Sequence, residues 1–379
     1  MMKTTTRITF LTIIPITLIV FPYTTVADSI KLTNGLTYEP IKIKNVVDGI
    51  ICYRMATGAI ITKPLTQVAC VTITRDKDLT QAEKLLVEGK YAQAKKFYLR
   101  SLKKAVAPWK KNLINYRLLV INQSTGKIDK AVEIWLKIVD ASNASIGSLA
   151  LCPKKLAPAK SPANDRAIDI LEKKLRTVSS KLYSQAILKL LVNLYERQGN
   201  LEKARQAATR LLGKQHTQPA TATSGGTSQT QQPIQQRSYE PQLRLARISL
   251  RSGRYSEAIG QLKPLLNKLS VKELPEGLYL IGRAKLELSK RTTDKNKAKK
   301  LLLEAGIKFM EVVSYFPQHL RAPRALLLAG EVNQRLGNIK AARKAYLTVI
   351  KQYNKSEAAK LAKKAIKLLT KTRSHSNSG

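Results

Sequence analysis

The sequence predicts a mainly α-helical protein, a helical-repeat solenoid that follows a small all-β segment. Three observations predict this architecture. A glycine-marked helix break recurs five times, the apolar residues around each break follow the helical period, and residues 28–74 instead alternate β-branched runs with turn dipeptides. A hydrophobic content of 44% with 6% aromatic residues suits helices that pack through Ala and Leu.

The β segment, 28–74, contains three turn signals, Asn34-Gly35, Asp48-Gly49 and Thr57-Gly58. Tight hairpin turns favour Asn-Gly and Asp-Gly because both central residues need a positive φ. The runs between the turns predict five short strands, at 29–33, 36–47, 50–55, 59–62 and 66–74. Their number and length resemble a small SH3-like or Sm-like barrel, and a β-meander packed on the first helix is the alternative.

The clearest repeat is the stretch 321–353, which predicts two helices separated by a break at Gly337. Gly330 and Ala342 lie where the two helices must approach closely, and Tyr346 fills the space beside them. One such hairpin cannot bury both of its faces, so further copies are expected.

Each copy is marked by a glycine that is followed five residues later by an alanine. With the copy at Gly337, such glycines occur at Gly89, Gly126, Gly199 and Gly253, and a degenerate copy with Ile281-Gly282 fits within 278–316. The pattern resembles the tetratricopeptide repeat (TPR), whose motif positions are matched in the last copy by Leu326, Ala329-Gly330, Asn333, Ala342 and Tyr346. This resemblance implies stacked antiparallel hairpins whose first helices line a concave groove.

The final block, 322–369, is also similar to C-terminal TPR segments of periplasmic cell-division coordinator and outer-membrane assembly proteins. The similarity lies in the helix after the hairpin, with Tyr353, Ser356, Ala359 and Ala362 at the matching positions. That helix, 356–370, has an apolar stripe and a Lys-rich face. It is predicted to cap the solenoid, and contact with an anionic membrane surface is the alternative.

The N-terminus predicts export. Lys3 and Arg7 precede the mainly apolar run 8–21, and Thr25-x-Ala27 has the small residues of a cleavage site. The run is too short, and too often interrupted by Thr and Pro, for a membrane span. We therefore expect a signal peptide and a periplasmic or cell-envelope protein, with an uncleaved anchor as the alternative.

Composition divides the chain into segments. We expect a signal peptide at 1–27, a small β domain at 28–74, a first TPR-like block at 78–213 with a loop at 142–164, a low-complexity linker at 214–236, a second TPR-like block at 237–370 and a disordered tail at 371–379. The linker is mainly Thr, Gln, Ser, Gly and Pro, so burial cannot offset the entropy of ordering it.

The chain is strongly basic, with 67 Lys and Arg against 25 Asp and Glu and a net charge of +42. Such an excess favours acidic partners, whether proteins, envelope polymers or anionic lipid. Export argues against nucleic acid as a partner. Lys is spread over nearly every helix, so exposed bases that keep the protein soluble explain the excess equally well.

The sequence lacks the motifs of common catalytic and metal sites. His216, His319 and His375 are far apart, and there is no H-E-x-x-H, paired C-x-x-C, EF-hand, G-x-S-x-G, Walker A or G-x-G-x-x-G pattern. We therefore expect a protein that is not an enzyme and that uses no cofactor or metal.

The three cysteines leave two alternatives open. Cys52 and Cys70 both fall on predicted strands, and export would permit a disulfide between them. Two buried thiols are the alternative, and Cys152 is the odd cysteine in a predicted loop.

Aligning the repeats on their glycines places several polar residues on the predicted groove. Lys189 and Asn193 match the pair with which carboxylate-clamp TPR proteins hold a peptide C-terminus. Arg244, Arg247 and Arg251 share one helix face, and guanidinium groups bind carboxylates with two hydrogen bonds. The full candidate set is Arg117, Lys189, Asn193, Arg197, Arg244, Arg247, Arg251 and Arg335.

These features predict a non-enzymatic TPR scaffold of the cell envelope that binds acidic proteins or peptides through a basic concave groove. The alternative is an electrostatic binder of acidic envelope polymers or of an anionic membrane surface. Salt distinguishes the two, because purely electrostatic binding should collapse steeply as ionic strength rises.

Overall fold

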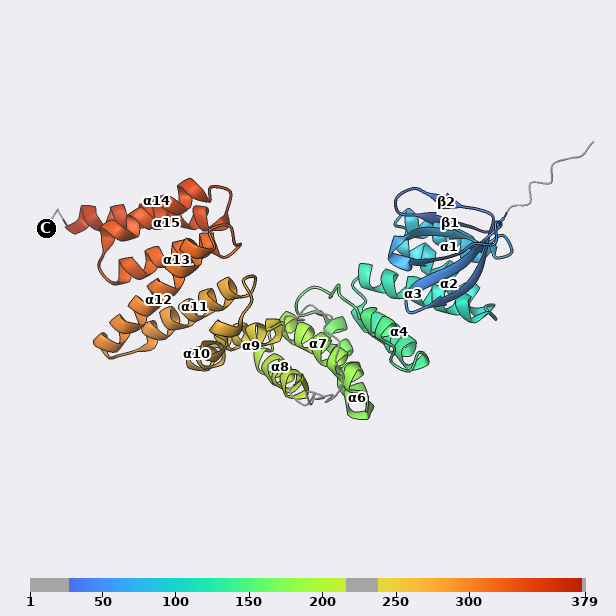
Figure 1. Cartoon of the computed structure of the whole chain (residues 1–379), viewed down its shortest axis with the longest axis horizontal. Coiled ribbons are helices and arrows are strands. Elements are labelled where there is room, and N and C mark those ends of the chain that lie inside the picture. Colours follow the sequence, from blue (N-terminus) through green and yellow to red (C-terminus); the bar gives the residue numbers. More distant parts are fainter. Residues whose placement is uncertain (1–26, 216–237, 377–379) are drawn as a thin grey trace, which may run out of the picture. The chain divides into compact units, whose positions relative to one another are not determined.

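The computed structural model describes residues 27–215 and 238–376 (Figure 1). All of the predicted signal peptide except Ala27, nearly all of the predicted linker and the last three residues of the predicted tail lie outside the described residues. The chain forms two compact units, 1–114 and 115–379, and each is described by itself. No helix in the described ranges is both long and apolar enough to cross a membrane.

The small all-β segment is confirmed as two antiparallel three-stranded sheets, with strand orders β2-β1-β6 and β3-β4-β5. The sequence predicts one strand at 36–47, but the structure has two strands there, in different sheets. Pro40 separates them because it has no N–H for a sheet ladder. The strands are β1 Ser29–Leu32, β2 Thr37–Tyr38, β3 Ile41–Val47, β4 Ile50–Met55, β5 Ile60–Pro64 and β6 Val68–Thr72.

The turn between β3 and β4 has the predicted chemistry. Asp48 and Gly49 both have positive φ, 54° and 75°, and Val47 pairs directly with Ile50. Two consecutive residues of positive φ match the right-handed twist of the flanking strands.

The first helical hairpin belongs to the same compact unit as the sheets. It consists of α1 Lys77–Val87 and α2 Tyr91–Lys103. Glu83 of α1 is fully buried, and its carboxylate accepts hydrogen bonds from the Val71 N–H of β6 at 3.0 Å and from the Tyr98 hydroxyl of α2 at 2.6 Å. This contact ties the sheet to the hairpin, so the compact unit extends beyond the β domain expected at 28–74.

The helical hairpins of the TPR-like prediction are confirmed. All five predicted glycines lie at helix junctions, with φ between 71° and 80°, where a side chain would be strained. The remaining helices in the described ranges are α3 Pro108–Ser124, α4 Ile128–Ala141, α5 Ile146–Ala150, α6 Pro162–Thr177, α7 Lys181–Gln198, α8 Leu201–Gln215, α9 Glu240–Arg251, α10 Tyr255–Leu262, α11 Leu274–Arg291, α12 Lys295–Tyr315, α13 Ala322–Arg335, α14 Ile339–Gln352 and α15 Glu357–Ser376.

Two glycines inside helices explain how closely paired helices approach. A Cβ at Gly330 of α13 would overlap the Tyr346 ring of α14, as the sequence predicts. A Cβ at Gly282 of α11 would lie 2.7 Å from the Phe309 ring of α12. The degenerate copy at 278–316 is therefore a helical hairpin as well, although its turn has no glycine.

The sequence predicts a loop at 142–164, but part of this stretch is helical in the structure. Ser145 begins α5 by accepting a hydrogen bond from the Ser148 N–H at 3.1 Å, and the Ser148 carbonyl accepts one from the indole of the buried Trp135 at 3.1 Å. The next helix, α6, begins at Pro162, because proline is tolerated in the first turn of a helix.

The second unit is not divided into two separate blocks at the predicted linker. Leu245 and Ile248 of α9 pack in the same apolar cluster as Ile187 of α7 and Leu211 of α8. At the C-terminal end, Ala359 and Ala362 of α15 are buried in a cluster with α14, as a capping helix requires. α15 continues to Ser376, so the predicted tail is helical over most of its length.

Candidate binding surfaces

The structure brings only part of the predicted groove together. Arg117 of α3 is 5% exposed, so it belongs to the interior and cannot line a binding surface. Lys189, Asn193 and Arg197 lie on α7, Arg244, Arg247 and Arg251 lie on α9, and Arg335 lies on α13. The residues of α7 and α9 meet through Glu196, an acidic residue that the sequence prediction did not include.

Glu196 of α7 is shared by two of the predicted arginines. Arg244 donates from Nε to the Glu196 carboxylate at 3.0 Å and from Nη2 to the Asn193 Oδ1 at 2.6 Å. Arg251 donates from Nη1 to the other oxygen of Glu196 at 3.2 Å. Both guanidinium groups and Asn193, one of the two residues of the predicted carboxylate clamp, therefore bind within the chain.

Glu276 of α11 is a second shared carboxylate. Arg247 donates to it from Nε at 3.2 Å, and Arg321, just before α13, donates from Nη2 at 2.9 Å. Burial alone would raise the pKa of Glu276, but the hydrogen bond from Arg321 and the charges of Arg321 and Arg247 hold it below its ordinary value. The Arg321 guanidinium also lies 5.0 Å from the centre of the Tyr279 ring.

We call this set the arginine network. Its role is structural, because each glutamate accepts hydrogen bonds from arginines that lie outside its own helix. Glu196 links α7 to α9, and Glu276 links α11 to α9 and to Arg321, the residue that precedes α13. The network consists of Arg244, Arg247, Arg251, Arg321, Glu196 and Glu276. Its arginines stabilise the stacking of the hairpins and do not face an empty site.

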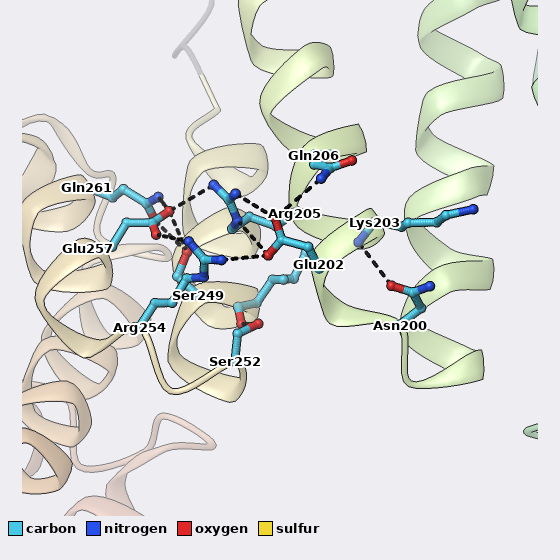
Figure 2. Close-up of polar contacts among 11 residues, drawn as sticks. Asn200, Glu202, Lys203, Arg205, Gln206, Ser249, Ser252, Arg254, Glu257 and Gln261 are labelled. Carbon is cyan, nitrogen blue, oxygen red and sulfur yellow. Dashed lines mark hydrogen bonds and ion pairs between the residues drawn. The ribbon is translucent and has the colours of Figure 1, made fainter.

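A second charged cluster joins α8 to α9 and α10 (Figure 2). Glu202 accepts from Arg205 at 2.8 Å on one oxygen and from Arg254 at 2.8 Å on the other. Glu257 accepts from Ser249 at 3.2 Å and lies 3.5 Å from Arg205. These contacts connect the helices on the two sides of residues 216–237.

The remaining predicted residues are also accounted for. Arg197 donates to the Ala157 carbonyl at 3.1 Å, and Arg335 donates to Glu331, one turn earlier on α13, at 3.3 Å. Lys189 is exposed. A row of unpaired guanidinium groups along the first helices is therefore not present among the described residues.

An apolar groove between α12 and α13 was missed by the sequence prediction. It encloses about 460 Å³ and contains Leu303, Ile307 and Met310 of α12, which are 49%, 57% and 44% exposed. Val332 of α13 and Leu336, just after this helix, form its other side. Contiguous apolar surface that lines a groove is a feature at which proteins bind partners or ligands.

The sequence does contain a signal for this groove. Leu303, Ile307 and Met310 follow each other at helical spacing of four and three residues, on a different face from the buried Ala305 and Phe309. A helix with apolar residues on two faces can be buried against its own chain on one face and against a partner on the other.

The described residues offer little for catalysis. They contain no group of three His, Cys, Asp or Glu side chains that could hold a metal. The pKa of His319 lies below its ordinary value because of burial, and burial raises the pKa of the Cys152 thiol to about 12. Such a thiol stays protonated and unreactive at neutral pH.

Cys52 and Cys70 lie on strands of different sheets, Cys52 on β4 and Cys70 on β6. Both are half-buried thiols in the structure. The disulfide between them stays a prediction, and the intact mass of the protein purified from its native host, with and without reductant, tests it.

No protein-family model and no curated protein matches this sequence. Among solved structures, the chain is similar to the C-terminal part of a TPR repeat-containing protein from Cytophaga hutchinsonii, with 17% identity over 74% of this chain and 98% of that one and a TM-score of 0.42. It is also similar to MamA from Desulfovibrio magneticus RS-1, with 12% identity, coverages of 60% and 97% and a TM-score of 0.38. PilW, a type IV pilus biogenesis factor, gives 15% identity, coverages of 76% and 99% and a TM-score of 0.30. No function is carried over from these proteins.

Proposed function

We propose that this protein is a non-enzymatic, TPR-like scaffold of the cell envelope that binds an amphipathic helix of a partner protein in the groove between α12 and α13. The observation that supports it is the cluster of half-exposed Leu303, Ile307 and Met310 in that groove. Because about half of each side chain is already buried, removing the rest from water stabilises a complex by about 0.7 to 1.5 kcal/mol for each one.

The shape of the groove favours a helix as the partner element. Its residues come from two neighbouring helices at one-turn intervals, the arrangement that receives i, i+4, i+7 side chains of a helix. A partner β-strand would instead need an exposed sheet edge, which a surface made of two helices does not offer.

Charges at the rim of the groove are already paired. Glu311 is the charged residue that lines the groove, and it pairs with Lys308 at 2.8 Å. Binding in the groove should therefore depend on apolar contact and should persist when ionic strength rises.

Site-specific photocrosslinking in the native host tests this proposal. A photoreactive amino acid replaces Ile307 in the full chain, and the control replaces Leu182 of α7, which is similarly exposed at 54%. We expect a discrete protein adduct at 307, no such adduct at 182, and loss of the adduct when Leu303→Asp and Met310→Asp are added. Identical adducts at both positions, or an adduct that survives the two substitutions, would contradict the proposal.

The envelope location rests on the N-terminal segment and has its own test. Cleavage after Ala27 predicts that the mature protein begins at Asp28. N-terminal sequencing of the protein from a periplasmic or envelope fraction should find Asp28. A chain that begins at Met1 in the cytoplasmic fraction would contradict export.

The electrostatic alternative needs bases that are not already paired. The arginine network does not supply them, because its arginines bind glutamates of this chain. The exposed bases of α14, at 340, 343, 344 and 351, have no ion-pair partner among the described residues.

A further inference from the structure

We propose that the outward face of α14 binds an acidic segment of a protein partner, one in which carboxylates surround a single apolar side chain. The face consists of Lys340, Arg343, Lys344 and Lys351 around Leu347, and we call it the α14 basic face. It is a different surface from the groove between α12 and α13, so each proposal can fail without the other.

The four bases lie on one side of the helix and point to solvent. Their spacing, at 340, 343, 344 and 351, follows the helical repeat, with Leu347 in the middle. All four are exposed, and Leu347 is 49% exposed. Together with Thr348 and Gln352 they line a shallow hollow on the helix surface.

No carboxylate in the described part of the chain forms an ion pair with the face. Among the described residues, none of the four bases takes part in an ion pair, in contrast to the arginine network. The sequence explains why, since no Asp or Glu occurs between Glu331 and Glu357. Glu357 itself pairs with Lys360 on α15 at 2.6 Å.

The face fits carboxylates with an apolar anchor better than a bilayer. Arg343 can bind one carboxylate with two hydrogen bonds, and the lysines supply point charges on both sides of Leu347. Helices that lie on membranes present several large apolar residues, often with Trp or Phe. The α14 basic face presents one leucine and no aromatic residue.

The test is a binding measurement on the purified mature full chain. The probe is a fluorescein-labelled peptide in which one leucine has two glutamates on each side, and the comparison peptide has glutamine in place of every glutamate. Vesicles of phosphatidylglycerol and phosphatidylcholine are the third probe. Binding is followed by anisotropy for the peptides and by co-sedimentation for the vesicles.

The test variant is Lys340→Gln with Lys344→Gln. The control variant is Lys295→Gln with Lys299→Gln, which makes the same change of charge at two exposed lysines with the same spacing on α12. Retained thermal unfolding temperature shows that both variants are folded. Leu347→Ala probes the apolar anchor separately.

We expect the glutamate peptide to bind and the glutamine peptide not to bind. The test variant should bind about tenfold more weakly, as expected for loss of charge-assisted contacts, whereas the control should stay within about twofold. Leu347→Ala should weaken binding by a smaller factor. The inference would be overturned if the glutamate peptide did not bind, or if the test and control variants lost equal affinity. It would also be overturned if the Lys340 and Lys344 substitutions weakened binding to vesicles but not to the peptide.

Discussion

Two basic regions of the second compact unit differ in what faces their charges. In the arginine network, Arg244, Arg247 and Arg251 each donate to a glutamate on a neighbouring helix, either Glu196 or Glu276. On the α14 basic face, none of the four bases has an ion-pair partner among the described residues. A base that is already paired contributes to stability, whereas an unpaired base is available to a partner.

The comparison changes how the net charge of +42 should be interpreted. The total alone does not locate a binding surface, because it counts paired and unpaired bases alike. The arginines that looked most like a ligand site hold hairpins together, and the bases that resemble an ordinary solvated helix face lack acidic neighbours. Substitutions in the two regions should therefore have different effects.

The largest difference is expected from double charge reversal. Arg247→Glu with Arg251→Glu removes three ion pairs and places carboxylates beside Glu276 and Glu196, so unfolding free energy should fall by about 3 kcal/mol. The sequence alone places both arginines in a partner-binding groove, whereas their contacts in the structure predict a loss of stability.

The control for this reversal is Lys340→Glu with Lys344→Glu, which makes the same change of charge on α14. Urea unfolding measures both variants, and the control should stay within about 0.5 kcal/mol of the wild type. Equal losses in the two variants would show that the regions do not differ.

The next largest effect is expected from removing a shared carboxylate. Glu276→Ala leaves Arg247 and Arg321 without their acceptor, and the half-buried position of both guanidinium groups sets the cost at about 2 kcal/mol. Glu357→Ala on the exposed surface of α15 is the comparison, and it should leave the unfolding midpoint unchanged. A similar midpoint shift for both variants would argue against a stabilising network.

A smaller effect on the unfolding free energy is expected from lowering the pH. Since the pKa of Glu276 is lowered in the folded chain, the unfolded chain takes up this proton first as pH falls. The stability that Glu276 provides is therefore complete above its ordinary pKa of 4.5 and is lost below it. Unfolding free energies at about pH 6 and about pH 4 should differ less in Glu276→Gln than in the wild type. If the unfolding free energies of the two proteins depended on pH in the same way, Glu276 would not contribute to the acid sensitivity.

The smallest effect should have the opposite sign. Lys340 and Lys344 are one helical turn apart and repel each other, so Lys340→Gln with Lys344→Gln should raise unfolding free energy by about 0.3 kcal/mol. Thermal unfolding at low ionic strength measures it, and added salt should reduce the gain. A destabilised variant would indicate that these lysines have partners in the folded chain.

Local features of the fold could be predicted from the sequence, because their causes are local. Each turn glycine adopts the positive φ that favours glycine, and Gly330 lies against Tyr346 as their positions in the repeat indicate. The short helix α5 could not be predicted, since it depends on the packing of Trp135 against the Ser148 carbonyl. Propensity alone does not show that contact.

The candidate site was less predictable because its contacts are distant in sequence. Glu196 and Arg244 are 48 residues apart, with the low-complexity segment between them. Nothing in the pattern of α9 shows that a carboxylate from α7 will face it. The groove between α12 and α13 has a local signal in the second apolar stripe of α12. The α14 basic face has one in a stretch without acidic residues. Both signals can be found once helix faces are assigned.

The most direct test of the central claim compares arginine side chains with one another. Hydrogen exchange of the Nε–H groups can be followed by NMR in the full chain labelled with ¹⁵N-arginine, with signals assigned by single Arg→Lys variants. Arg244 and Arg247 donate from Nε to glutamates at 3.0 and 3.2 Å, whereas Arg343 has no such acceptor among the described residues. The account predicts slow exchange at Arg244 and Arg247 and fast exchange at Arg343, and equal rates at all three would contradict it.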